Sequence, residues 1–359
     1  MSSINHIILL LCFSLLSAFS FHDDLIPLTF SGETLNKPFL GGFNRPKIQW
    51  LDLDEDEDLD LFILDASGYL RYMENYGNHN TPDFHLITTS YQDVFCGGWF
   101  YFADFDNDGD LDLTAQNDQD PDYISYFQNT DGDLDFIEVL YTVSGTNVTS
   151  SSVMTPTFAD IDDDGDLDFF TGNSVGTLTY YENIGISNGL PQFEFITNTW
   201  QDIYIIGGTR MDDRHGASAI TFIDLDADGD LDLSWGDFYQ QSLYIIWNIG
   251  SAEFPVMYGV TPQYPPENPI ISTGQNMPTF SDLDGDGDED LFVTVLSGVS
   301  GSQLVDNFYY YENIGSNAVP TYTYITNNYF SILDIYNNSS PELVDIDQDG
   351  DLDLFVANQ

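Results

Sequence analysis

One aspartate-rich pattern recurs six times along the chain and constrains the fold more than any other feature. Each copy consists of an apolar segment, the pattern D-x-D-x-D-G-D-x-D, and a second apolar segment. The copies begin at Asp52, Asp104, Asp160, Asp224, Asp282 and Asp345. The separations of 52, 56, 64, 58 and 63 residues suit one four-stranded unit per copy and are too irregular for a tight solenoid. The repeat therefore predicts a β-propeller with one blade for each copy.

A second, aromatic landmark follows each of the first five motifs and predicts a third strand that ends in a turn. These segments are Tyr72–Asn75, Tyr126–Asn129, Tyr180–Asn183, Ile245–Asn248 and Tyr310–Asn313. A fourth strand is predicted at Phe84–Thr88, Phe193–Thr197 and Tyr322–Thr326, where β-branched and aromatic residues alternate. Helical periodicity is absent, so we expect an all-β fold with four strands in each blade.

The segments before the first motif and after the last one indicate how the ring of blades closes. Leu25–Phe30 resembles a lone fourth strand, so we expect the N-terminus to complete the last blade. The sixth motif ends at Asp353, and the sequence stops at Gln359 before any aromatic third strand. Either the closing blade is irregular or this sequence is a piece of a longer protein, which we favour because open sheet edges are normally protected. The prediction is six blades, or seven if the chain continues.

The aspartate motif has the spacing of a calcium loop. In the second copy, Asp104, Asp106 and Asp108 occupy positions 1, 3 and 5, and Gly109 allows a sharp turn at position 6. Asp110 offers its carbonyl at position 7, and Asp112 closes the loop at position 9. So many hard oxygen ligands suit Ca²⁺ better than octahedral Mg²⁺, and zinc would favour His or Cys. We expect about five to six bound calcium ions.

Four further copies conform to this pattern, and their predicted ligands are Asp160, Asp162, Asp164, Asp166 and Asp168; Asp224, Asp226, Asp228, Asp230 and Asp232; Asp282, Asp284, Asp286, Asp288 and Asp290; and Asp345, Asp347, Asp349, Asp351 and Asp353. The first copy offers Asp52, Asp54, Asp56, Asp58 and Asp60, but Glu57 stands where the turn glycine is expected. A side chain is disfavoured at positive φ, so this site is the doubtful one. Asp131–Asp135 resembles a seventh copy but lacks upstream aspartates, and we predict a polar hairpin there.

An EF-hand and a plain polar turn both suit the motif less well than a calcium loop between strands. An EF-hand needs a bidentate glutamate at position 12, where this chain has residues such as Ile63, Ala115 and Thr171. Asp and Gly also make ordinary turns. Six copies with four or five carboxylates each favour metal ligation over such turns.

The motif and the apolar strand after it resemble the FG-GAP or VCBS repeat, which occurs in integrin α-subunit propellers and in many secreted microbial proteins. The resemblance covers nearly all of residues 25–359. It implies a propeller with calcium in the hairpin between the first two strands of each blade, on one face of the ring. Integrin-like propellers usually have seven blades, whereas this chain has six motifs.

The charge balance limits the classes of partner. The chain has 60 Asp and Glu residues against 6 Lys and Arg, a net charge of −54. Such a charge opposes compaction unless bound cations offset it, which independently suggests metal. Six basic residues cannot neutralise a phosphate backbone, so neither nucleic acid nor an anionic membrane is expected as a direct partner.

The N-terminus has the features of a secretory signal peptide. An apolar run from Ile7 to Leu16 is followed by small residues before Phe21, so residues 1–20 are the predicted signal. A short membrane anchor is the alternative, because no Lys or Arg precedes the run. Residues 21–359 are predicted to form a single propeller domain, with Cys96 as its only cysteine. We therefore expect a secreted or cell-surface protein without an intrachain disulfide.

Partner binding is expected on the face opposite the aspartate loops, where five connections lead into new blades. They are residues 91–99, 141–154, 200–217, 258–277 and 327–340. Loops on a rigid scaffold often carry recognition. Trp200, Tyr258 and Tyr264 are candidates to stack on sugar rings or to anchor a protein, or else they pack neighbouring blades.

Catalytic candidates are few. His215 lies in the only basic cluster, residues 210–215, and Cys96 is interpreted as a small buried apolar residue. No nucleophile elbow or zinc-protease motif is present, so we expect no enzyme activity. The favoured function is a calcium-dependent adhesion or protein-interaction module in which the calcium is structural. The alternatives are a carbohydrate-binding propeller and a non-catalytic part of a polysaccharide-active enzyme.

Overall fold

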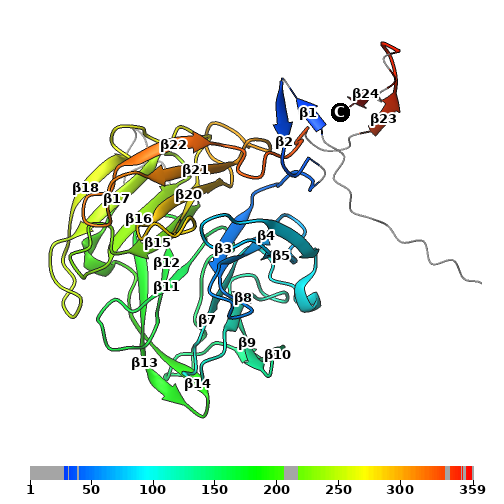
Figure 1. The fold of residues 1–359 in the computed structure, drawn as a ribbon. Helices are drawn as coiled ribbons and strands as arrows, with labels where there is room; N and C mark the ends of the chain where they lie inside the picture. Colours follow the sequence, from blue (N-terminus) through cyan, green and yellow to red (C-terminus); the bar gives the residue numbers. More distant parts are fainter. Residues whose placement is uncertain are drawn as a thin grey trace, which may run out of the picture.

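The computed structural model describes residues 28–30, 32–38, 40–205, 217–335, 340–348, 350 and 353–357. The regular structure of these residues is β-sheet, with two short 3-10 turns at Tyr91–Asp93 and Trp200–Asp202. Five four-stranded antiparallel meanders make up most of this part of the chain (Figure 1). The first two are β3 (Lys47–Leu51), β4 (Asp60–Leu64), β5 (Leu70–Asn75) and β6 (Phe84–Thr88), then β7 (Phe100–Ala103), β8 (Asp112–Gln116), β9 (Ile124–Thr130) and β10 (Asp133–Val139).

The other three blades repeat this order. They are β11 (Thr157–Ala159), β12 (Asp168–Gly172), β13 (Leu178–Ser187) and β14 (Leu190–Thr197); β15 (Ser218–Ile223), β16 (Asp232–Asp237), β17 (Leu243–Asn248) and β18 (Met257–Tyr264); and β19 (Asn276–Ser281), β20 (Asp290–Val295), β21 (Phe308–Asn313) and β22 (Tyr322–Thr326). The predicted aromatic and fourth strands are confirmed as β5, β9, β13, β17 and β21, and as β6, β14 and β22.

Five apolar cores join neighbouring blades and close the ring. Four of them lie between consecutive blades, such as the core where Phe62 of the first blade meets Phe102 of the second. The fifth joins the last blade to the first, with Trp50 packed on Phe292 at 5.0 Å between ring centroids. The described residues therefore form a five-bladed propeller, and the prediction of six or seven blades is wrong.

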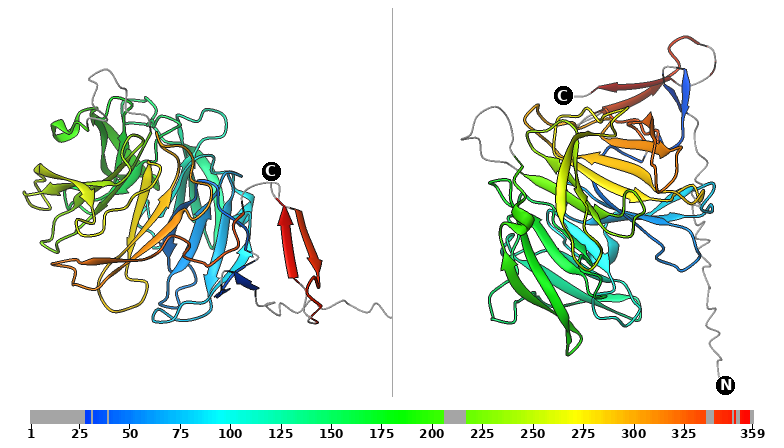
Figure 2. Two further views of the ribbon diagram at one scale, coloured as in Figure 1. Left: turned by 90° about the horizontal axis from the view of Figure 1, so that it is seen from above. Right: turned by 90° about the vertical axis from the view of Figure 1, so that its left-hand side faces the viewer.

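The sixth aspartate motif lies outside this ring. It connects β23 (Ser340–Val344) and β24 (Asp353–Ala357), which form a separate two-stranded sheet beside the propeller (Figures 1 and 2). None of its described residues belongs to the five cores. Phe355 is 45% exposed, whereas Phe62, at the same place in the first repeat, is fully buried. Without a third and fourth strand of its own, this hairpin does not become a blade.

The N-terminal strand does not complete the last blade, contrary to expectation. β1 (Leu28–Phe30) pairs with β2 (Glu33–Leu35) in its own hairpin. The ring closes instead through side-chain packing and hydrogen bonds. The Asn307 amide nitrogen donates to the carbonyl of Phe43 at 2.7 Å.

Burial explains why the second strand of each blade is so apolar. All described residues of β4, β8, β12, β16 and β20 are buried, because each blade packs against a neighbour on both faces. The outer strand β6 instead exposes His85, Leu86 and Ile87. In the described part of the chain, no helix is long and apolar enough to span a membrane. The predicted signal peptide lies outside the described residues.

Candidate functional site

Four of the five aspartate loops of the ring share one hydrogen-bonded conformation between the first and second strands of the blade, and the fifth differs in one bond, since the Asp286 N–H donates to Asp284 instead of Asp282. In the second blade, the Asp104 carboxylate accepts the N–H groups of Asp108 at 3.1 Å and Gly109 at 2.9 Å. Asp108 in turn accepts the N–H of Asp110 at 3.0 Å. The third and fourth blades repeat all three bonds. Because these bonds are local, the motif specifies the loop conformation by itself.

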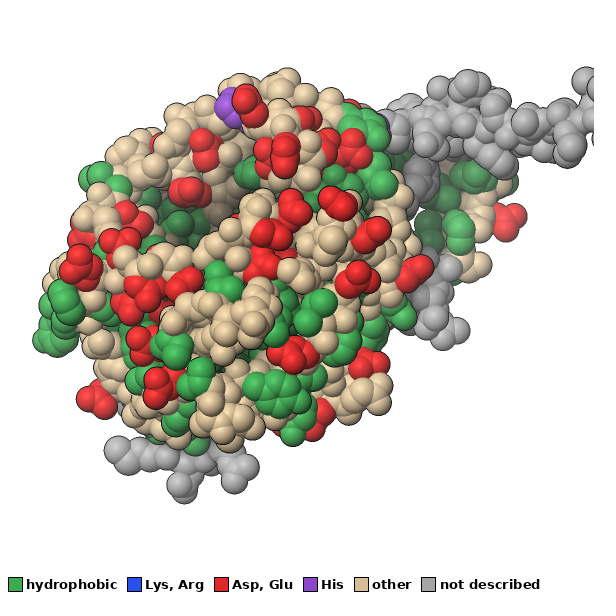
Figure 3. Space-filling view, turned by 90° about the horizontal axis from the view of Figure 1, so that it is seen from below, with side chains coloured by type: hydrophobic (Ala, Val, Ile, Leu, Met, Phe, Trp, Pro, Cys, Tyr) green, Lys and Arg blue, Asp and Glu red, His purple; other side chains and the backbone are tan. Residues whose placement is uncertain are grey.

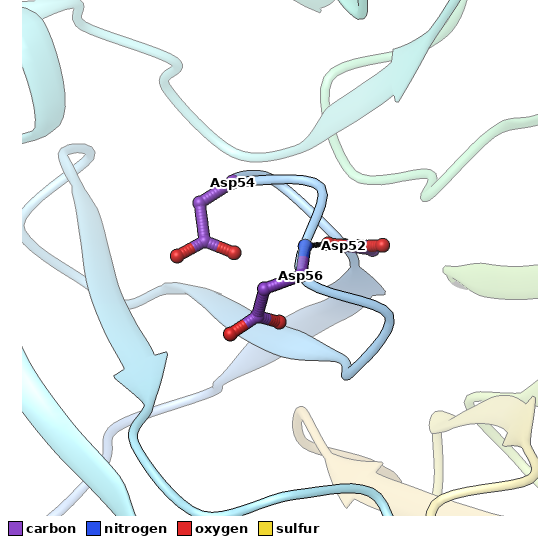
Figure 4. Close-up of side chains that lie close together, drawn as sticks. All are labelled: Asp52, Asp54 and Asp56. Carbon is purple, nitrogen blue, oxygen red and sulfur yellow. Dashed lines mark hydrogen bonds between the residues drawn. The ribbon is translucent and has the colours of Figure 1, made fainter.

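The carboxylates at positions 1, 3 and 5 lie close enough together to share one cation. In each of the five ring loops, an oxygen from each of the three aspartates falls within 4.8 Å of the other two. Figure 4 shows Asp54 and Asp56 on the same side of the first loop, with Asp52 bound to the backbone nitrogen of Asp56. Three carboxylates at this separation repel one another unless a cation lies between them.

Several buried carboxylate oxygens in the loops have no hydrogen-bond partner, and this is the observation that fits a metal. They belong to Asp58, Asp106, Asp162, Asp230, Asp232, Asp282, Asp288 and Asp345. Burial, followed by the charge of neighbouring aspartates, raises the pKa of Asp162 and Asp226. A buried carboxylate needs a hydrogen-bond donor or a cation, so the donor set suits a hard ion that binds oxygen.

The aspartate at position 9, the predicted closing ligand, also bonds to the third strand of its blade. Asp112 is fully buried and accepts the Tyr126 hydroxyl at 2.8 Å and the Asn129 N–H at 2.8 Å. Asp60, Asp168 and Asp290 make the equivalent pair of bonds. In these four blades position 9 therefore connects the loop to the third strand through both of its oxygens. In the fourth blade Asp232 accepts the Asn248 N–H at 2.7 Å, and its buried Oδ2 has no hydrogen-bond partner.

The first loop keeps the shared conformation even though Glu57 replaces the turn glycine. Glu57 adopts φ 74°, and its N–H reaches Asp52 at 3.2 Å. Position 4 is left-handed too, which sequence analysis missed: Asn107, Asp163 and Gln348 have φ of 60°, 57° and 63°. Asn and Asp tolerate this region, which is a weak signal that the sequence did contain.

The sixth loop keeps two bonds of the same kind. The Gly350 N–H donates to Asp345 at 3.2 Å, and the Ile346 N–H donates to Asp353 at 3.0 Å. Its predicted ligands Asp349 and Asp351 lie outside the described residues.

The Asp131–Asp135 segment is not a metal loop. Asp131 and Gly132 form the two-residue turn between β9 and β10, with φ of 55° and 92°. The predicted polar hairpin is confirmed, since positive φ at both residues is typical of a tight hairpin turn.

Two of the three aromatic candidates for ligand stacking are buried. Trp200 and Tyr264 are 6% and 3% exposed and lie in the cores between blades, so for these two residues the alternative that they pack neighbouring blades is confirmed. Tyr258, at 72% exposed, remains accessible on β18. Cys96 is fully buried as predicted, and burial raises the pKa of its thiol to about 12. His215 lies outside the described residues.

Four of the five predicted partner-binding connections contribute residues to one end of the central channel, and residues 327–340 contribute none. A cavity of about 570 Å³ opens there and is lined by all five blades, and we name it the channel mouth. Part of its lining comes from the starts of inner strands and the segments before them, including Lys47, Gly98, Thr155, Ala217 and Gln275. The rest follows the second strands of three blades and consists of Ser174, Phe238, Tyr239, Leu296 and Ser297. A second cavity of about 450 Å³ lies further toward the aspartate loops, lined by residues such as Gln49 and Asp282.

Charge at the channel mouth differs from that of the rest of the molecule. Asp and Glu side chains are scattered over the face shown in Figure 3, yet two of the basic residues, Arg45 and Lys47, line the channel mouth. Burial, followed by the Arg45 charge, lowers the pKa of Lys47 to about 8, and the Asp65 carboxylate opposes this shift. Among the described residues that line this cavity, Tyr239 has the only other titratable side chain.

Comparison with known proteins identifies the repeat. A family model described as the FG-GAP-like repeat matches residues 52–115, 104–171, 224–293 and 282–356, which together exceed half of the chain. No match is found among curated proteins. A solved structure described as a crystal structure of a thermostable family-43 glycoside hydrolase has a TM-score of 0.41 and 13% identity, over 80% of this chain and 94% of that chain. The likeness to that structure is too distant to bear on activity.

Proposed function

Because the chain belongs to the family of FG-GAP-like repeat proteins, we propose that it is a secreted or cell-surface binding protein whose propeller is stabilised by calcium. The observation that carries the calcium proposal is the set of buried carboxylate oxygens without hydrogen-bond partners in the loops. The ligands would be the side chains at positions 1, 3 and 5, with oxygens of position 7 completing the set. About five to six ions are expected, one for each motif.

Calcium in these loops has a structural role in this proposal. Each ion neutralises a carboxylate cluster and holds the hairpin between the two innermost strands of a blade. Extracellular calcium sites bind at about 10⁻⁴ to 10⁻³ M. At a free concentration tenfold above Kd, one site adds about 1.4 kcal/mol to the free energy of unfolding. Several sites together would make the ring strongly calcium-dependent.

Adhesion or protein interaction through the face opposite the loops is the favoured activity, without catalysis. Support comes from the channel mouth, where all five blades contribute residues to one cavity on that face. The second candidate function is carbohydrate binding. The polar side chains among the lining residues of the same cavity, such as Ser152, Ser174 and Gln275, support it. Secretion rests on the predicted signal peptide at residues 1–20.

Thermal melting in calcium, in EDTA, and in EDTA with excess magnesium tests the metal proposal. EDTA should lower Tm sharply, calcium should restore it, and magnesium should restore little, because Mg²⁺ needs a near-ideal octahedron of short bonds and gives up its bound water reluctantly. Asp106→Asn should weaken the response to calcium. Asp131→Asn removes the same charge from an exposed turn outside the loops and is the matched control. A melting curve unmoved by EDTA would overturn the proposal.

Ligand capture separates the two candidate activities. The calcium-loaded protein is tested against a glycan panel and against extracellular proteins, with EDTA as the control for folding of the propeller. Saturable binding to proteins alone supports adhesion, whereas saturable binding to glycans alone supports the second candidate function.

A further inference from the structure

The basic residues of this chain are few, and the described ones fall into two groups. Lys37 pairs with Asp83 at 2.8 Å, and Arg71 pairs with Asp65 at 3.2 Å. Arg45 and Lys47 form no ion pair and donate no side-chain hydrogen bond to any described residue. Both line the channel mouth. In a protein with a net charge of −54, two unpaired cations in one cavity call for an anionic partner.

The position of Lys47 makes such a partner energetically favourable. Lys47 begins the inner strand β3, is shielded from solvent over most of its surface, and has its pKa lowered by burial. The ammonium loses hydration there, and Asp65, which is ion-paired with Arg71, offsets that loss only in part. A bound carboxylate would supply a counter-charge and two acceptor oxygens. Arg45 is exposed beside it and can contact the same group from the rim.

The rest of the lining suits a hydroxylated ligand. Ser152, Ser174 and Ser297 present hydroxyl groups, Gln275 presents an amide, and Phe238 and Tyr239 present aromatic rings. A cavity of about 570 Å³ falls within the usual range for small-molecule sites. Aromatic rings with hydroxyl and amide groups can contact both the faces and the hydroxyls of a sugar ring.

We propose that the channel mouth binds a carboxylate-bearing sugar, with Lys47 and Arg45 contacting the carboxylate and the polar lining contacting the sugar hydroxyls. This inference rests on the proposed binding function and names the ligand class for its site. The negative charge of the remaining surface acts over a Debye length of about 8 Å at physiological salt, so it opposes entry less than it would in dilute buffer.

Isothermal titration of the calcium-loaded full chain tests the inference with three probes at physiological salt. The probes are a digalacturonate, the neutral digalactoside of the same linkage, and an Asp-Glu dipeptide with a similar charge. Digalacturonate should bind at least about tenfold more tightly than either of the others, the size of effect expected when one charged contact is made or lost. Equal affinity for the neutral sugar, or for the dipeptide, would overturn the inference.

Three variants locate the site. Lys47→Gln should weaken digalacturonate binding by at least about tenfold, and Arg45→Gln by about threefold, because Arg45 lies at the exposed rim. Lys37→Gln removes a cation that is paired with Asp83 outside the cavity. The affinity of this variant for digalacturonate should equal that of the wild type. Since Arg45 is exposed, its variant still tests the inference if Lys47→Gln fails to fold. Unchanged affinity in both folded variants would contradict it.

Ligand capture distinguishes failure of this inference from failure of the proposed binding function. If the wild-type protein captures a protein or a neutral glycan and the Lys47→Gln variant captures it equally well, this inference fails while the proposed binding function stands. If no ligand of any kind is captured, the proposed function fails as well.

Discussion

The hydroxyl of Tyr126 donates a 2.8 Å hydrogen bond to Oδ2 of Asp112, and this bond joins an aspartate loop to the third strand of its blade. The backbone N–H of Asn129, three residues further along the chain, donates to Oδ1 of the same carboxylate at 2.8 Å. The fixed spacing of Tyr and Asn thus matches the last aspartate of the motif. In the fourth blade Ile245 replaces the tyrosine, and Asp232 keeps the bond from Asn248.

Tyr126→Phe should lower the free energy of unfolding by about 1–3 kcal/mol, because it removes a donor from a buried carboxylate. The measurement is denaturant unfolding in calcium. Tyr76→Phe removes a hydroxyl from a side chain that is 59% exposed and should have no effect. Equal stability of Tyr126→Phe and the wild type would show that the bond is not important for the blade.

Ala227→Gly should stabilise the fourth loop, because Ala227 occupies the left-handed region at φ 54°. Relief of that strain is worth about 1 kcal/mol. Ala227→Val should destabilise, since a β-branched side chain fits this region worse. In calcium, the Tm should therefore be highest for Ala227→Gly, intermediate for the wild type and lowest for Ala227→Val. The reverse order would contradict the left-handed conformation of position 4.

Ending the chain after Ile335 should leave the ring intact. The β23–β24 hairpin contributes no described residue to the cores, so Tm should change by no more than about 2 °C. Phe330→Ala is the contrasting variant: it truncates a side chain in the core that closes the ring and should cost about 3–5 kcal/mol. Unfolding of the shortened chain would mean that the sixth repeat belongs to the ring.

Lys47→Met should raise Tm at neutral pH by about 2–6 °C, because it removes a buried ammonium. The gain should depend on pH. The folded pKa of Lys47 is about 8, below the ordinary value of 10.5, so between these values the unfolded chain holds the proton that the folded chain has lost. Wild-type stability therefore rises relative to the variant across this window. Arg45 and Asp65 are the charges that act on Lys47.

The measurement is a series of melting curves for both proteins from about pH 7 to pH 10.5. The difference in Tm should narrow as the pH rises. A constant difference would show that Lys47 is not desolvated in the folded protein.

The sequence predicts the blades and the loops well because both depend on short-range chemistry. The apolar second strand, the aromatic third strand and the hydrogen bond that the Gly109 N–H donates to Asp104 all lie within one repeat. Counting aspartate motifs, however, gives the wrong number of blades. The five aromatic third strands give the number of blades that the described residues form.

The remaining features depend on contacts that one repeat does not reveal. Position 9 carries the same residue type as the positions proposed to bind calcium, so only the structure shows that Asp112 bonds to the third strand and Asp104 to its own loop. The channel mouth unites residues as far apart as Lys47 and Gln275, and no pattern in the sequence connects them. The burial of Trp200 likewise depends on the neighbouring blade.

Calcium binding in the aspartate loops is the central claim, and counting bound ions by native mass spectrometry tests it most directly. The wild-type chain should carry five to six calcium ions, the Asp104→Asn/Asp106→Asn variant should carry one fewer, and Asp131→Asn should carry the full number. A wild-type protein that carries no calcium, or the same number of ions in the loop variant, would contradict the account.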